Sequence, residues 1–293
     1  MRLNKIVFIA AAMLAVAACS TEKETEKPVV KPDNPQPEQP SETPLTFTAT
    51  LQQFTEAQIG TKTAMSGPLS AKWQPGDRIA VFCGKSTSQY SYVTSAGDGT
   101  FTGNGKKASL YRAVYPSGMT TGFSLGKSES VPDTLSIHFP CEQTAVNGSF
   151  DPTATAAVCT STDDKLAFQN VGGLVRFTLN GTGITKATLR TPDGTRFGGV
   201  AKVIMDSGND PEIASYVDKK SAYSVWLRPS NGTFESGGTY YFSIPPQELS
   251  HGVKIIFTNS EGKEAIWSDT TPIKVERSTI ADLGTIDTGS LLW

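Results

Sequence analysis

Reactive side chains that could converge on a metal or a substrate are scarce in this sequence. Two of its 293 residues are histidines, His138 and His251. It has neither an HExxH motif nor the paired cysteines of a zinc site. The adjacent Asp163 and Asp164 are expected to form a polar turn rather than a pair of catalytic acids. We therefore expect no catalytic residues, no metal site, no cofactor and no enzymatic activity.

Positive charge is not concentrated anywhere either. The chain has 26 basic and 28 acidic residues and a formal net charge of −2. Proteins that bind nucleic acid neutralise phosphates with a basic patch or stripe, and no such cluster occurs. We therefore expect no nucleic-acid partner.

Long apolar runs are limited to Ile6–Ala18, which follows Arg2 and Lys5. This run is too short to cross about 30 Å of hydrocarbon, but it fits the core of a signal peptide over residues 1–18. The stretch VAAC, ending at Cys19, resembles the bacterial lipobox, in which the cysteine is lipidated and becomes the mature N-terminus. Acyl chains on Cys19 would anchor the protein durably in a membrane. The alternative is an ordinary signal peptide followed by an incidental cysteine.

Apolar residues are sparse in the next stretch, residues 19–44. It carries Glu22, Glu24 and Glu26 and then a series of prolines. Such a composition cannot form a packed core, so a disordered tether is predicted. The acidic residues directly after Cys19 resemble an export signal of outer-surface lipoproteins. We expect a lipid anchor in the outer membrane with the protein facing the cell exterior.

No segment after Cys19 keeps a helical apolar period, whereas a period of two recurs. Leu45, Phe47, Ala49 and Leu51 alternate with threonines, which is typical of a half-buried strand. Similar strands follow at short intervals with glycine-containing turns between them, which predicts an all-β fold of antiparallel sandwiches. A polar turn suggests two domains, at residues 45–163 and 164–293, each of a usual sandwich size.

The cysteines beyond Cys19 are few and odd in number. Cys83, Cys141 and Cys159 cannot form a disulfide scaffold. A bond between Cys141 and Cys159 remains an alternative, but buried thiols are favoured.

Four tryptophans raise the alternative of a sugar-binding protein, because exposed indole rings stack on sugars. Trp226 and Trp267 lie in expected strands among aliphatic residues, and Trp73 follows Ala71 on an expected inward face. These three are therefore predicted to lie in the core. Only Trp293, at the end of the sequence, has no obvious core position.

Six blocks spread over the chain resemble the fimbrillin-like lipoproteins, subunits of strand-exchanged (type V) pili. They are TFTATLQ, GTKTAMSG, LSAKWQPGDRIAVF, LAFQNVGGLVRFTLNG, GGTYYFSIPPQELSHGVKIIFTNSEGK and RSTIADLGTID. The resemblance implies two tandem transthyretin-like β-sandwich domains, no catalytic residues, no cofactor, and a role in pilus assembly and adhesion. The partners would be other pilin subunits and a protein or glycan on a host or bacterial surface. The alternative function is a glycan-binding surface lipoprotein of a nutrient-uptake system.

The resemblance also implies how such a subunit would assemble. In shaft-forming members a protease cuts after a basic residue near the position of Lys62-Thr63, and the first strand leaves. Here that strand would carry Leu45, Phe47, Ala49 and Leu51. The groove would then accept the C-terminal segment of the next subunit, which corresponds to Thr279–Trp293. Asp282 and Asp287 interrupt the alternation of that segment.

Two tripeptides resemble an O-glycan acceptor pattern of exported proteins in the same kind of bacteria. They are Asp133-Thr134-Leu135 and Asp269-Thr270-Thr271, and they make Thr134 and Thr270 the candidate attachment sites. Tripeptides this short also occur by chance, so a chance match is the alternative.

Overall fold

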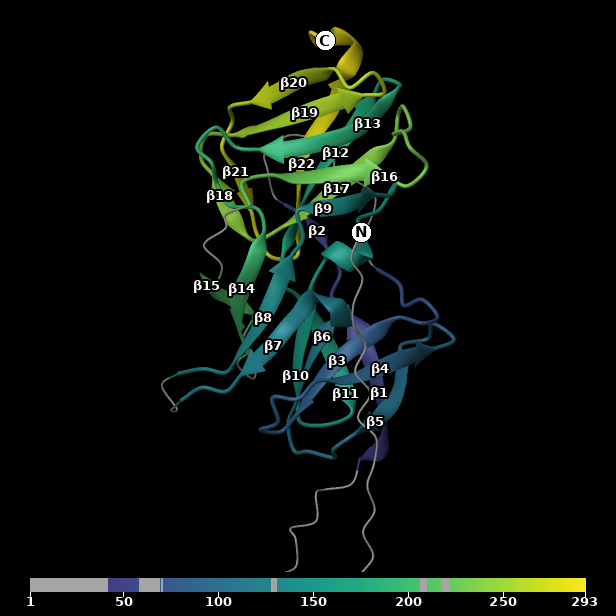
Figure 1. Ribbon diagram of the computed structural model, residues 1–293, viewed down its shortest axis with the longest axis vertical. Helices are drawn as coiled ribbons and strands as arrows, with labels where there is room; N and C mark the ends of the chain where they lie inside the picture. The colour runs from purple at the N-terminus through teal and green to yellow at the C-terminus, as the bar shows by residue number, and fades with distance from the viewer. Residues whose placement is uncertain (1–41, 58–68, 70, 128–130, 206–209, 218–221) are drawn as a thin grey trace, which may run out of the picture. The chain divides into compact units, whose positions relative to one another are not determined.

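The computed structural model describes residues 42–57, 69, 71–127, 131–205, 210–217 and 222–293 (Figure 1). Cys19, Lys62 and Thr63 lie outside these residues. The described part is all-β, as predicted, and its helical segments are single 3-10 turns: η1 (Ser117–Met119), η2 (Pro152–Ala154) and η3 (Thr288–Ser290). Within these residues no helix has the length and apolar character needed to cross a membrane.

Seven strands form a closed barrel in the first part of the fold. In spatial order they are β1 (Thr43–Leu51), β11 (Lys165–Asn170), β10 (Ala157–Ser161), β6 (Tyr111–Tyr115), β3 (Arg78–Cys83), β4 (Tyr90–Ser95) and β5 (Thr100–Gly105). β1 closes the barrel, because it pairs antiparallel with β5 and parallel with β11. The apolar residues of its alternating pattern point to the interior, where they meet Val81 and Tyr92.

A four-stranded sheet, here called sheet D, packs against the outside of this barrel. Its strands, in order, are β15 (Glu212–Tyr216), β14 (Gly199–Ile204), β8 (Thr134–Phe139) and β7 (Thr120–Ser124). Ala80 and Phe82 of β3 point away from the barrel interior and join Leu135, Ile137 and Val203 in a second core. This explains why β3 is apolar on both faces.

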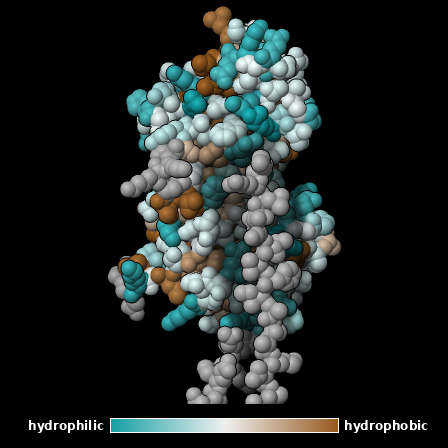
Figure 2. Space-filling view, in the orientation of Figure 1, coloured by the Kyte–Doolittle hydropathy of each residue, from teal (hydrophilic) through white to brown (hydrophobic). Residues whose placement is uncertain are grey.

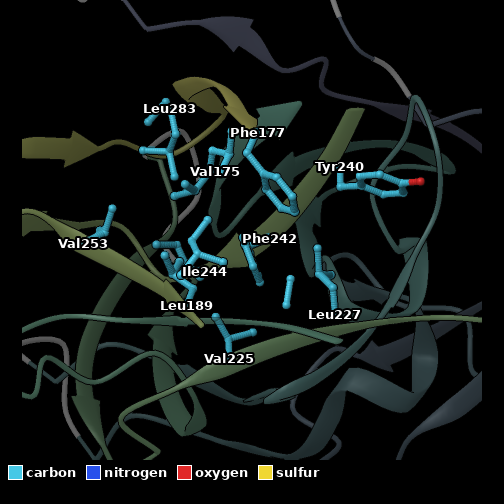
Figure 3. Close-up of a cluster of buried hydrophobic side chains, with 14 of the residues drawn as sticks. Val175, Phe177, Leu189, Val225, Leu227, Tyr240, Phe242, Ile244, Val253 and Leu283 are labelled. Atoms are coloured by element: carbon cyan, nitrogen blue, oxygen red, sulfur yellow. The ribbon is translucent and has the colours of Figure 1, made fainter. Parts of the chain in front are cut away.

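Two further sheets form a sandwich around the largest core. Sheet C contains β17 (Thr239–Ile244), β12 (Gly173–Asn180), β22 (Thr279–Asp287) and β2 (Thr55–Glu56). Sheet F contains β20 (Glu264–Asp269), β19 (Val253–Asn259), β13 (Ile184–Arg190), β16 (Val225–Pro229) and β9 (Glu142–Ala145). β18 (Gln247–Leu249) pairs with β21 (Ile273–Val275) beside them. Figure 3 shows Phe177 and Phe242 of sheet C pointing towards Leu189, Val225 and Leu227 of sheet F.

Strand pairing crosses the expected division between residues 163 and 164. That position lies in the turn of the β10–β11 hairpin, and both strands of this hairpin belong to the barrel. β2 and β9 come from the first part of the sequence but pair with β22 and β16. Conversely, β14 comes from the second part and pairs with β8. The sheets are therefore built from interleaved segments rather than from two consecutive halves.

The cysteines of the described part form no disulfide with one another, so no bond joins Cys141 to Cys159. Cys83 and Cys159 are buried in the barrel core. Burial raises the pKa of both thiols, in the case of Cys159 to about 12, because desolvation disfavours the thiolate.

Candidate functional site

The first strand is hydrogen-bonded along both of its edges. Thr43–Thr48 pair with β5, and Thr48–Leu51 pair with β11. Further backbone bonds run from Thr48 N to Asp164 O and from Ala49 N to Gly99 O, each 2.9 Å long. Taking β1 away would therefore leave two unpaired strand edges facing each other, which is a template for another strand.

The side chains of β1 form part of the barrel core. Phe47 is only 1% exposed, and its ring lies 4.9 Å from that of Tyr92 and 5.0 Å from that of Tyr111, both edge to face. Ala49 is also buried, whereas Leu45 and Leu51 are half-buried and pack against the same cluster. The four predicted residues thus share one face, and their removal would expose an aromatic floor.

Trp73 fixes the far end of this strand. Its indole Nε1 donates a hydrogen bond of 2.9 Å to the carbonyl oxygen of Ala49. The ring lies 4.9 Å from Phe101 and 4.8 Å from Tyr115, both edge to face. Trp73 therefore packs on the barrel core as predicted, and it does not offer a platform to a sugar.

Beyond β1 the chain passes directly to sheet C. Phe54 is buried against Phe150, with ring centroids 5.2 Å apart. β2 then pairs with β22, and the nitrogens of Thr55 and Ala57 donate to the carbonyls of Ser278 and Ile280 at 3.0 Å. The segment that carries the first strand is thus part of both the barrel and sheet C.

An ion-pair group holds β2 against sheet C. Arg176 Nη1 lies 2.6 Å from Glu56 Oε1, and Arg176 Nη2 lies 2.8 Å from Asp282 Oδ2. Arg176 is 4% exposed. Burial by itself lowers the pKa of this guanidinium, but hydrogen bonds and charge from Asp282 and Glu56 outweigh burial and raise it. Each carboxylate therefore stabilises a cation that is out of contact with water.

The predicted donor segment Thr279–Trp293 is mostly a structural strand here. β22 occupies residues 279–287 and lies between β12 and β2. Ile280, Ala281, Leu283 and Ile286 are buried. The two acids that break the alternation have structural partners: Asp282 pairs with Arg176, and Asp287 accepts a hydrogen bond of 2.9 Å from Gly289 N.

Only the last six residues extend past this strand. Leu292 is 94% exposed, and Figure 2 shows hydrophobic atoms at this end of the chain. The indole nitrogen of Trp293 donates a hydrogen bond of 3.0 Å to Thr288 O. A free donor strand of the expected length is therefore not present in this state.

The two candidate glycosylation sites lie in different settings. Thr134 belongs to β8 and is paired on both sides, opposite Ile204 and Ser124, while the neighbouring Asp133 is ion-paired with Arg112. Thr270 is exposed in the connection after β20. Of the two, only Thr270 presents its hydroxyl on an unpaired segment.

The histidines do not converge on a site. His138 is exposed on β8. His251 Nδ1 lies 3.1 Å from Asp193 Oδ2, and the pKa of Asp193 is lowered by hydrogen bonds from Thr195, Thr191 and His251. No cluster of three or more potential metal ligands occurs in the part of the chain that the structure describes.

One hollow, on the outer face of sheet F, was not predicted from the sequence. Trp226 was predicted to lie in the core, but it is only half-buried, on the outer face of sheet F. It lines a hollow of about 640 Å³ together with Tyr223 and Arg190. In a strand Trp226 faces away from Val225 and Leu227, but all three residues are apolar, so alternation alone did not identify the outer face.

The fold is that of an all-β protein made of sandwich-like sheets. Solved structures of similar fold were found by structural comparison. A proposed cell adhesion protein from Bacteroides ovatus superposes with a TM-score of 0.50 at 12% identity, over 86% of this chain and 95% of that one. A proposed cell adhesion protein from Bacteroides uniformis gives 0.43 at 13% identity, over 75% and 90%. A third, from Bacteroides fragilis, gives 0.40 at 11% identity, over 84% and 95%. No family model and no curated protein matches the sequence. The chain thus shares its fold with the B. ovatus protein.

Proposed function

We propose that this chain is a non-catalytic cell-surface lipoprotein that serves as a structural and adhesive subunit of a strand-exchanged pilus. The fold shared with a proposed cell adhesion protein supports this function. The observation that carries it is the position of β1, which is the first strand in the sequence and the strand that closes the barrel. A single cut in the connection between β2 and β3 would separate it from the rest of the chain.

Cleavage after Lys62 would release β1 and β2 together. The barrel would then be open between β5 and β11, with unpaired backbone groups along both edges and Tyr92 and Tyr111 on the floor. An extended segment with apolar residues at alternating positions fits such a groove, because the main chain supplies hydrogen bonds and the pockets supply specificity. The gap is therefore the acceptor site of the proposed exchange.

The same structure argues against this chain donating its own C-terminal strand. β22 pairs with β12 over most of its length and buries four apolar side chains. Withdrawal of β22 would expose these residues and leave Arg176 without Asp282. We therefore propose that the subunit accepts a strand but retains β22, which would place it at an end of the assembly.

The test uses the 20–293 protein with a site-specific protease sequence inserted after Lys62. After cleavage, a fluorescent peptide with the β1 sequence TPLTFTATL should bind, as measured by anisotropy, and the Phe47→Asp peptide should not. Uncleaved protein is the control, because its groove is occupied. If cleaved protein released its N-terminal fragment but bound no peptide, the proposed exchange would be wrong. Heat-stable ladders of cleaved protein alone would contradict the terminal position.

A further inference from the structure

The outer face of sheet F carries a tryptophan where a solvent-facing strand position is expected. Val225 and Leu227 point into the core in Figure 3, and Trp226 lies between them on β16. Its cross-strand neighbours are Thr188 on β13 and Glu142 on β9. An indole ring at such a half-buried position keeps part of its apolar face exposed, where a ligand can cover it.

Trp226 forms one wall of a hollow with a volume of about 640 Å³. Tyr223, which is 52% exposed, and the guanidinium-bearing Arg190 also line it, with the hydroxyl residues Thr191 and Ser224. A volume of this size is in the usual range for small-molecule sites, which combine aromatic walls with a few polar groups. The two aromatic side chains can pack on the apolar face of a ligand ring. The hydroxyl groups and the guanidinium beside them can bind polar groups at the edge of that ligand ring.

The charge around this hollow is unbalanced. Arg190 on β13 lies directly opposite Lys254 on β19, and both are exposed. Like charges opposite each other destabilise a sheet. Within the described residues neither side chain has an ion-pair or hydrogen-bond partner. Arg190 therefore offers an uncompensated positive charge in the hollow, and Lys254 adds a second charge one strand further away.

Acidic groups on the adjoining segments are engaged elsewhere. Glu142, across from Trp226, pairs with Arg228 at 3.5 Å. Asp193, in the turn after β13, accepts hydrogen bonds from Thr195 and His251. Asp269, at the end of β20, accepts a hydrogen bond from Thr271 N at 2.9 Å. An anionic ligand would therefore find Arg190 and Lys254 available.

We propose that this hollow binds a sugar that carries a carboxylate, such as a uronic or sialic acid at the end of a surface glycan. Trp226 and Tyr223 would cover the C–H face of the pyranose ring, which removes apolar surface from water. Arg190 would hold the carboxylate through paired hydrogen bonds, with Lys254 adding charge. The inference rests on the adhesive function proposed above and supplies the chemical class of its ligand.

The test is binding of the uncleaved 20–293 protein to sialyllactose, to a glucuronic acid oligosaccharide, to neutral lactose and to a sulfated galactose, by calorimetry or on an array. We expect binding to at least one of the carboxylated sugars, weakened by added salt, and no measurable binding to lactose. Arg190→Gln should reduce this affinity about tenfold or more, because a charged hydrogen bond is lost. Lys263→Gln, on an exposed turn of the same sheet, is the matched control and should leave it unchanged.

Trp226→Ala should also reduce binding, and Tyr223→Ala provides a second aromatic variant whose exposed side chain can be removed without disturbing the core. Absence of binding to both carboxylated sugars at millimolar concentration would overturn the inference. Equal binding of lactose, or binding of the sulfated sugar alone, would also overturn it. The Arg190→Gln protein should still capture the β1 peptide after cleavage. Failure of that peptide test would refute strand exchange but not the sugar site.

Discussion

Arg176 and Glu56 are 120 positions apart in the sequence, yet their side chains lie 2.6 Å apart. Arg176 belongs to β12 in the middle of sheet C, and Glu56 belongs to the short strand that precedes the proposed cleavage site. A buried guanidinium thus depends partly on a carboxylate from the segment that would be removed. The ion pair therefore makes the stability of sheet C depend on whether the N-terminal segment is in place.

Replacement of Glu56 by alanine should destabilise the protein by about 1.5 kcal/mol, because Arg176 loses one charged hydrogen bond but keeps Asp282. Urea unfolding would measure this difference. Glu264→Ala is the matched control, since Glu264 is exposed on β20. Its effect should lie within about 0.5 kcal/mol. Equal stability of the two variants would show that Glu56 does not support Arg176.

Gly99→Ala should destabilise the barrel more than Gly76→Ala. Both glycines have positive φ angles, +86° and +88°. A Cβ on Gly99 would lie 2.7 Å from Ala49 O and 2.9 Å from Trp73 Cδ1, whereas a Cβ on Gly76 would meet nothing within 4 Å. The difference in the free energy of unfolding between the two variants isolates the crowding around Trp73. We expect this difference to be about 2 kcal/mol, measured by thermal or urea unfolding. Similar losses in both variants would contradict this close packing.

The thiol of Cys159 should make stability depend on alkaline pH. Its pKa is raised by burial from 9.0 to about 12, so the unfolded state loses this proton at a lower pH than the folded state does. The stabilisation is therefore complete below pH 9 and is lost as the pH rises from 9 to 12. Between pH 8 and 10 the free energy of unfolding should fall less steeply in Cys159→Ala than in the parent protein. Identical slopes would show that this thiol does not contribute.

Cys19→Ser should move the protein from the membrane fraction to the soluble fraction, because the serine hydroxyl cannot replace the thiol in lipid attachment. The measurement is fractionation combined with incorporation of labelled palmitate in cells that express the full chain. Cys141→Ser is a control for loss of a cysteine in general. A serine variant that stays in membranes and still incorporates palmitate would refute lipidation at Cys19.

The strands themselves could be predicted from local patterns. Leu45–Leu51 alternates apolar residues with threonine, and the structure has a strand at Thr43–Leu51 with the apolar residues inward. Arg78–Cys83 is apolar on both faces, and it is covered on both sides. These predictions succeed because side-chain alternation depends on neighbouring residues only.

Which strands pair with each other could not be predicted in the same way, because pairing depends on segments that are distant in the sequence. The polar turn at Asp163 looks the same whether it separates two domains or closes a hairpin, and here it closes the β10–β11 hairpin. The pairs of β2 with β22 and of β9 with β16 are parallel and join remote parts of the chain. Trp226 was assigned to the core because its strand is apolar on both sides, so the pattern alone did not say which face is buried.

Closure of the barrel by β1 also has a consequence for the order in which the protein folds. β1 is synthesised first, but one of its two partners, β11, emerges only after all the other barrel strands have been made. Contacts between segments so remote in sequence form slowly, because the intervening chain must first be ordered. Until β11 has been made, the barrel therefore stays open between β1 and β10. At this stage the edge of β1 that later pairs with β11 is exposed, whereas the gap proposed for assembly lies between β5 and β11 and opens only when β1 itself leaves.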